Sequence, residues 1–143
     1  MVKTVDTLNQ VCIINVSFNK NSNIQGYKIM KIVPKFWRKN SSLKTVNIVT
    51  HEWFDRVNGN TYFANEVTVN QGLKNEFSFN MPFEYGYGDH SLNRTAQVLK
   101  SIGATNLNVY RWSDCKDNNI TVNQTRIENC KKRDLMAIKG DYL

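Results

Sequence analysis

The dipeptide Asn58-Gly59 is the feature that most constrains how this chain can fold. Asn and Gly readily supply the two positive-φ conformations of a type I′ turn, whose twist matches that of two paired strands. Residues on both sides have β-type patterns, over 44–54 (KTVNIVTHEWF) and 61–69 (TYFANEVTV). The sequence therefore predicts an antiparallel hairpin with a type I′ turn at Asn58-Gly59.

A segment of unusually regular alternation follows the hairpin. Apolar side chains occupy every second position: Phe77, Phe79, Met81, Phe83, Tyr85 and Tyr87. Residues at this spacing share one face of an extended chain, so we expect one packed aromatic face and one solvated face. Pro82 lacks the amide that a central strand needs, which predicts that this strand lies at an edge of the sheet.

A helix is predicted next, from about residue 90 to residue 102. Asp89 is a favourable N-cap, and Gly103 stands where a glycine ends many helices. Apolar residues recur at helical spacing: Leu92, Ala96, Leu99 and Ile102. We expect this helix to cover the aromatic face of the sheet.

The remaining segments suggest further strands. Short β-type patterns occur over 11–18, 26–33 and 107–112, whereas 113–123 is polar and loop-like. Residues 125–139 fit either a short C-terminal helix, opened by a capping box at Thr125, or a strand. The whole chain, 1–143, is thus predicted to be one α+β domain. It would hold a single antiparallel sheet of about five or six strands and the helix at about 90–102.

Composition narrows the class of protein. Hydrophobic residues make up 41% of the chain, which is enough for a packed core. No run approaches the roughly 20 apolar residues of a membrane span, and the N-terminal residues lack the apolar stretch of a signal peptide. The three cysteines are too few and too scattered for a disulfide framework, which is typical of reduced thiols in a cytosol.

The net charge of +7 is concentrated in the first third of the chain. No Asp or Glu occurs between Thr7 and His51, whereas this span holds seven of the 19 basic residues. The other twelve basic residues equal the 12 acidic ones in number, so the rest of the chain is neutral. A one-sided positive field attracts anions and steers acidic partners, although it can also serve only as a solvated face.

Residues 34–42 (PKFWRKNSS) combine this charge with two aromatic side chains. Proteins that bind single-stranded nucleic acid pair positive grooves with aromatic stacking platforms, and Trp and Arg also anchor protein partners. The predicted binding residues are Lys28, Lys31, Lys35, Phe36, Trp37, Arg38, Lys39 and Lys44. The alternative is that at least one of the two aromatic rings packs on the core.

Candidate catalytic and metal-binding residues are few. His51 and Glu52 are adjacent on a predicted strand and should point to opposite faces, while Asp89 beside His90 has a capping role. The cysteines and histidines show no C-x-x-C or H-x₃-H spacing. We therefore expect no metal, no cofactor and no catalytic residue.

Two motifs resemble a pattern in small uncharacterised proteins of bacteriophages and prophages. The motifs are WFDRVNGNTY at 53–62 and YGYGDH at 85–90, and the resemblance covers roughly residues 52–100. In that family the matching pieces form a hairpin and an aromatic turn into a helix, and no activity is known that could be carried over. The resemblance implies a phage-type protein in the cytoplasm of a bacterial host.

The leading hypothesis is a non-enzymatic binding protein that resembles anti-CRISPR and other inhibitors of host defence. Its basic N-terminal third would engage nucleic acid or a nucleic-acid-handling host complex, and no membrane. The alternative is a virion structural or accessory protein. A small enzyme that uses His51, Glu52, Asp89 or His90 is the least favoured class.

Overall fold

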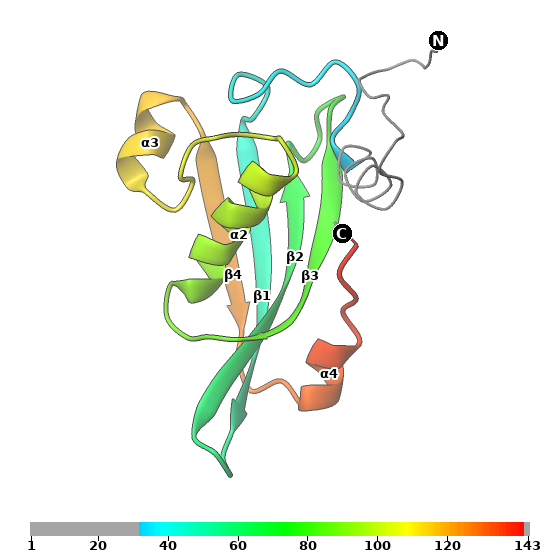
Figure 1. The fold of residues 1–143 in the computed structure, drawn as a ribbon, viewed down its shortest axis with the longest axis vertical. Coiled ribbons are helices and arrows are strands. Elements are labelled where there is room, and N and C mark those ends of the chain that lie inside the picture. Colours follow the sequence, from blue (N-terminus) through cyan, green and yellow to red (C-terminus); the bar gives the residue numbers. More distant parts are fainter. Residues whose placement is uncertain (1–31, 142–143) are drawn as a thin grey trace, which may run out of the picture.

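The structure, a computed structural model, describes residues 32–141. Four strands form one mixed sheet in the order β3-β2-β1-β4 (Figure 1). The strands are β1 (Thr45–Asp55), β2 (Asn60–Val69), β3 (Phe77–Tyr85) and β4 (Thr121–Ile127). The helices are α2 (His90–Ser101), α3 (Trp112–Asp117) and α4 (Lys132–Met136). The predicted α+β class is confirmed for this part of the chain.

The sheet is mixed, so the prediction of an antiparallel sheet is wrong in one place. β1 pairs antiparallel with β2, but it pairs parallel with β4, which begins beside Thr45. The predicted strand at 107–112 is a turn that leads into α3, and the predicted loop at 113–123 holds α3 and the start of β4. Residues 125–139 contain both alternatives in succession, the end of β4 and then α4. The predicted strand at 11–18 lies outside the described residues, as does most of that at 26–33.

The hairpin exists, but its turn is not type I′. Asp55 pairs with Asn60, so four residues form the loop, and only Gly59 has a positive φ, of 72°. The Asp55 carboxylate accepts hydrogen bonds from the Val57 and Asn58 amides and from the Asn58 side chain. The Asn58 side-chain bond is the main reason why the pKa of Asp55 lies below its usual value. This carboxylate favours a wider turn than the dipeptide alone predicts.

Two rows of apolar side chains face α2. Val46, Val69 and Phe77 stand side by side across three strands, and Ile48, Val67 and Phe79 form the next row. Leu99 and Ile102 of α2 belong to the same buried cluster. α2 therefore covers this face as predicted, and Gly103 at φ +84° ends the helix. The capping role predicted for Asp89 is wrong, because its side chain makes no cap hydrogen bond and is 90% exposed.

A β-bulge reverses the faces of β3 near its end. Tyr62 pairs with Tyr85 and Asn65 with Met81, so Pro82 and Phe83 together stand opposite one residue of β2. Met81 still faces α2, but Phe83 stacks on Tyr62 on the other side of the sheet. The prediction that all the aromatic side chains share one face therefore fails after Met81, because a bulge adds one residue to the alternation.

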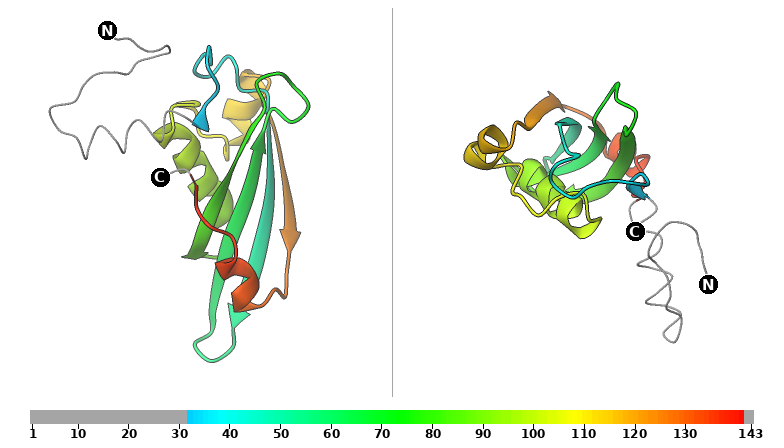
Figure 2. Two further views of the ribbon diagram at one scale, coloured as in Figure 1. Left: turned by 90° about the vertical axis from the view of Figure 1, so that its right-hand side faces the viewer. Right: turned by 90° about the horizontal axis from the view of Figure 1, so that it is seen from above.

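β3 and β4 form the two edges of the described sheet. The prediction that Pro82 lies on an edge strand is confirmed, since β3 is the outermost strand on its side. Seen from above, α2 lies on one side of the sheet and the segment leading to α4 on the other (Figure 2). Lys132 of α4 lies over the ring of Trp53, which faces away from α2. Short α4 thus covers part of the second face, near the base of the hairpin.

Candidate functional site

The segment 34–44, here called the basic loop, enters β1 at the end of the sheet opposite the hairpin (Figure 1). Trp37 anchors its middle. The indole Nε1 donates a hydrogen bond to the Ala104 carbonyl at 2.9 Å, and the ring packs edge-on against Phe77 with centroids 5.3 Å apart. The core alternative therefore holds for Trp37, which supports the loop instead of presenting a free aromatic face.

Asn40 provides the second anchor. It adopts a positive φ of 69°, and its amide donates to the Ala104 carbonyl at 3.2 Å. Its Oδ1 accepts hydrogen bonds from the Thr105 hydroxyl at 2.6 Å and the Asn106 amide at 2.9 Å. The loop is thus fastened to the segment that follows α2.

Asn70, at the end of β2, holds the other end of the loop. Its side chain is fully buried, and its Oδ1 accepts from the amides of Lys44 and Thr45 at 2.8 and 3.0 Å. Its Nδ2 donates to the Ser42 carbonyl at 2.7 Å and to Asn75 Oδ1 at 2.9 Å. One amide side chain therefore joins the basic loop to the β2–β3 connection.

Phe36 projects from this well-anchored loop. Its side chain is 96% exposed, and its φ is +64°. The other described non-glycine residues with positive φ are all asparagines: Asn40, Asn70, Asn119 and Asn129. A bulky residue rarely adopts this conformation, because its Cβ crowds the following carbonyl. The fold therefore holds an apolar ring in solvent at a conformational cost.

Exposed cations flank Phe36 along the chain. Lys35, Arg38 and Lys39 are exposed in the same loop, and Lys44 is exposed where the loop enters β1. No acidic residue occurs from residue 32 to residue 51. The predicted binding residues within the described range are thus all at the surface except Trp37. Lys28 and Lys31 lie outside it.

The candidate catalytic residues do not converge. His51 Nε2 lies 3.0 Å from Glu66 Oε1, whereas Glu52 points to the opposite face and pairs with Arg126. His90 Nε2 lies 3.4 Å from Glu84 Oε2, and the same oxygen accepts from Arg94 Nε at 2.8 Å. Each imidazole thus has a single carboxylate partner at the surface of a scaffold element. The arrangement offers no acid–base pair in a cleft.

No group of three or more metal-binding side chains gathers within residues 32–141. The Cys115 thiol is buried, donates to the Val109 carbonyl and has a raised pKa, mainly through burial and also through the charge of Asp114. A thiol with a raised pKa is a poor nucleophile and a poor metal ligand at neutral pH. We therefore interpret Cys115 as a residue that packs in the core.

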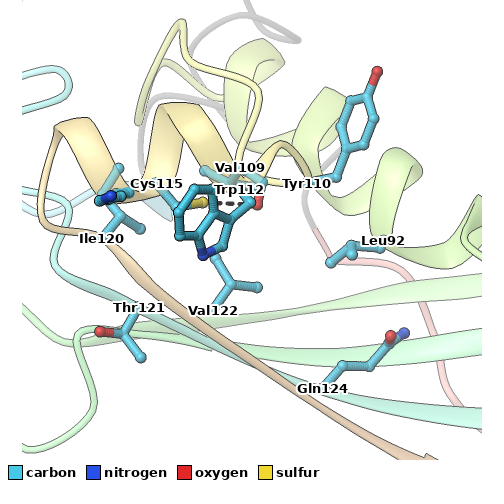
Figure 3. A pocket seen from close by; sticks show the side chains of 10 residues that line it. Leu92, Val109, Tyr110, Trp112, Cys115, Ile120, Thr121, Val122 and Gln124 are labelled. Atoms are coloured by element: carbon cyan, nitrogen blue, oxygen red, sulfur yellow. Dashed lines mark hydrogen bonds between the residues drawn. The ribbon is translucent and has the colours of Figure 1, made fainter.

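A cleft between α2, α3 and β4 was not predicted from the sequence. It has a volume of about 490 Å³, with Leu92, Val109, Ile120 and Val122 among its apolar lining residues (Figure 3). Trp112 at its rim is 74% exposed, and Lys116 Nζ lies 4.8 Å from the Trp112 ring centre. The sequence did not predict this cleft because most of its lining residues belong to 107–112 and 113–123, which were predicted to be a strand and a loop.

The chain matches no protein-family model, and comparisons with curated proteins and with solved structures also found no match. The phage-type setting thus stays a prediction from residues 52–100. Among the described residues, no helix combines the length and apolarity needed to cross a membrane. The strongest local candidate for function is the basic loop with its exposed Phe36.

Proposed function

We propose that the protein is a non-enzymatic binder of single-stranded nucleic acid, and that the basic loop is its binding surface. In this proposal Lys35, Arg38 and Lys39 contact phosphates, and the ring of Phe36 stacks on a base. The observation that carries the proposal is the conformation of Phe36, which is exposed and strained within an anchored loop.

The strain at Phe36 argues for a selected surface feature. A left-handed conformation costs about 1–2 kcal/mol for a residue with a side chain. Packing does not offset this cost, because the ring is 96% exposed. Backbone strain that brings no packing gain is a common property of ligand-binding positions. Stacking of a base on an aromatic ring stabilises binding by about 1–3 kcal/mol, enough to offset the strain.

The charges around Phe36 fit a polyanion. The exposed cations lie on both sides of the ring along the chain, and no carboxylate interrupts them between residues 32 and 51. Trp37 and Asn40 hold the loop in place, so little loop entropy is lost when a ligand binds. A single-stranded nucleic acid whose phosphates flank a stacked base would match this order of charge, ring and charge.

The resemblance to phage proteins suggests where such a binder would act. A nucleic-acid-handling complex of the bacterial host presents both exposed nucleic-acid strands and acidic protein surfaces. An inhibitor of host defence would occupy the nucleic-acid path of such a complex. Binding of free nucleic acid is the first step to test, because it needs no knowledge of the host.

Removing three cations from the basic loop should separate specific from general charge effects. We expect the variant Lys35→Ala/Arg38→Ala/Lys39→Ala to bind a fluorescent single-stranded oligonucleotide at least about tenfold more weakly at low salt. The slope of log affinity against log salt should fall by about 2, because three phosphate contacts are lost. Fluorescence anisotropy over a salt series measures both quantities.

The matched control removes the same charge elsewhere. Lys131→Ala/Lys132→Ala/Arg133→Ala lowers the net charge equally but acts at α4, on the opposite end of the sheet. Equal losses in the two triple variants would show that only net charge matters. If the wild-type protein binds neither single-stranded DNA nor RNA at low salt, the proposal is wrong. Capture from a bacterial lysate with and without nuclease would then identify a protein partner.

Phe36→Gly should strengthen the fold and weaken the function. Glycine adopts a φ of +64° without the strain of about 1–2 kcal/mol, but it loses about 0.5–1 kcal/mol more backbone entropy on folding, so we expect the free energy of unfolding to rise by a net of about 0.5–1 kcal/mol. Affinity for the oligonucleotide should fall about tenfold with an unchanged salt slope, because stacking is lost and no phosphate contact changes. Urea unfolding and anisotropy measure the two effects. A variant that binds as tightly as the wild type would exclude stacking on Phe36.

A further inference from the structure

The geometry of β4 points to a second copy of this chain as its partner. We infer that two copies pair through β4, antiparallel and centred on Gln124, to form one continuous sheet across a two-fold axis. The surface is distinct from the basic loop. The inference rests on the open edge of β4, on its residues and on the contrast with the opposite edge of the sheet.

The free backbone groups of β4 can be assigned from its pairing with β1. The Thr121 amide donates to the Lys44 carbonyl at 2.9 Å, so Thr121 points its backbone groups toward β1. Backbone direction alternates along a strand, and Val122, Gln124 and Arg126 therefore point their amides and carbonyls away from the sheet. Within residues 32–141 these outward groups have no hydrogen-bond partner. Such a row is a template for another strand.

The opposite edge of the sheet is protected in several ways. β3 carries Pro82 and the bulge, and both interrupt strand pairing. The C-terminal segment covers it further, since the Asn80 amide donates to Asp141 Oδ1 and the Asp141 amide donates to the Asn80 carbonyl. β4 (TVNQTRI) has no proline, no lysine and no bulge. Among residues 32–141, β4 is thus an unprotected edge of a sheet whose other edge is protected, and a partner strand accounts for this contrast.

The residues of β4 are compatible with self-pairing. With Gln124 opposite its own copy, Val122 lies across from Arg126 of the second copy, and Asn123 lies across from its Thr125. No like charges meet, because Arg126 is the single charged residue of the strand and is held by Glu52 and the Gly88 carbonyl. The Gln124 pair and the Val122–Arg126 pair place outward amides opposite outward carbonyls.

Exposed apolar surface lies along the same edge. Ile127 is 43% exposed at the end of β4, and in this register it faces Thr121 of the second copy. Trp112 lines the same cleft as Ile120, Thr121 and Val122, at the start of β4 (Figure 3). On the face of the sheet away from α2, the paired β4 strands bring together Thr121, Asn123, Thr125 and Ile127 of both copies. Cross-strand contacts between β-branched side chains stabilise paired strands, so this face adds to the pairing.

Sedimentation velocity and amide exchange by NMR test this pairing together. We expect the wild-type protein to dimerise with rising concentration. Exchange of the amides of Val122, Gln124 and Arg126 should slow as the dimer forms. The amides of Asn123 and Thr125 already bond to β1, so their exchange should not respond to concentration and provides an internal reference.

A lysine on β4 should weaken the dimer. Thr125→Lys adds a charge to an exposed position, and the lysines of the two copies become diagonal neighbours. We expect the dimer dissociation constant to rise at least about tenfold. Ser78→Lys places the same charge on exposed β3 and should leave the constant unchanged. Circular dichroism checks that both variants fold.

Three outcomes would overturn the inference. The first is a protein that stays monomeric up to about 1 mM, which would leave the edge to a foreign strand or to solvent. The second is a dimer in which the outward amides of β4 gain no protection. The third is a dimer that Thr125→Lys and Ser78→Lys weaken equally, because the contact would then depend on net charge alone.

Discussion

An Asn70→Ala variant is expected to lose about 3–4 kcal/mol of unfolding free energy. The Asn70 side chain is fully buried and makes four hydrogen bonds, to the basic loop, to the first residue of β1 and to the β2–β3 connection. Alanine removes all of them and leaves buried amides and carbonyls without partners, which costs more than the bonds alone. Alanine also tolerates the φ of +55° less well than asparagine does.

The measurement is urea unfolding, followed by nucleic-acid binding at a temperature where the variant is folded. Asn119→Ala is the matched control, because Asn119 has nearly the same φ of 56° but is exposed. It isolates the conformational cost, which should be about 1 kcal/mol. If both variants lose the same stability, the hydrogen bonds of Asn70 contribute little. Under the proposed function, Asn70→Ala should also weaken binding, since Lys44, the last residue of the basic loop, loses its anchor.

Short-range signals in the sequence were sufficient for much of the scaffold. The hairpin, the edge position of Pro82, α2 and its terminal Gly103 each depend on residues within a few positions of one another. Turn chemistry and helical spacing act over that distance, so a single sequence carries them. Even here the type of the turn was wrong, because the Asp55 carboxylate reorganises the loop.

Long-range pairing was the part that the sequence did not reveal. β4 lies on the edge of the sheet, and its alternate residues are exposed, so its pattern is polar and resembles a loop. Its parallel pairing with β1 joins residues more than 70 positions apart. The bulge in β3 is equally hidden, because the alternation of apolar residues continues through it while the backbone gains one residue. Neither feature has a local signature strong enough to detect.

The candidate site was predicted as a region but not in its detail. Charge counting located the basic loop, since charge is read directly from the residues. It did not distinguish Phe36 from Trp37, which are neighbours of similar character in opposite environments. The distinction depends on the Ala104 carbonyl and on Phe77, both distant in sequence, and on the sign of one backbone angle. These two contacts and this backbone angle form only when the chain folds.

The second large effect is expected at Tyr62, on the face of the sheet that the bulge creates. Tyr62 belongs to a cluster of rings: its centroid lies 5.3 Å from Trp53 and 4.8 Å from Phe83, which are themselves 6.2 Å apart, and it meets Tyr85 edge-on at 5.7 Å. Each aromatic pair adds about 0.5–1.5 kcal/mol beyond the area it buries. Tyr62→Ala should therefore lower the unfolding free energy by about 3 kcal/mol and reduce the near-UV circular dichroism signal.

Tyr62→Phe is the control for this prediction, since it keeps the ring and removes the hydroxyl. It should stay within about 1 kcal/mol of the wild type. If Tyr62→Ala costs as little as Tyr62→Phe, Phe83 does not stack on this face and the bulge is misplaced. The same variants address function. Tyr62 lies outside the basic loop, and Tyr62→Phe keeps its ring. Under the proposed function, nucleic-acid affinity should therefore follow Phe36 and be unchanged in Tyr62→Phe.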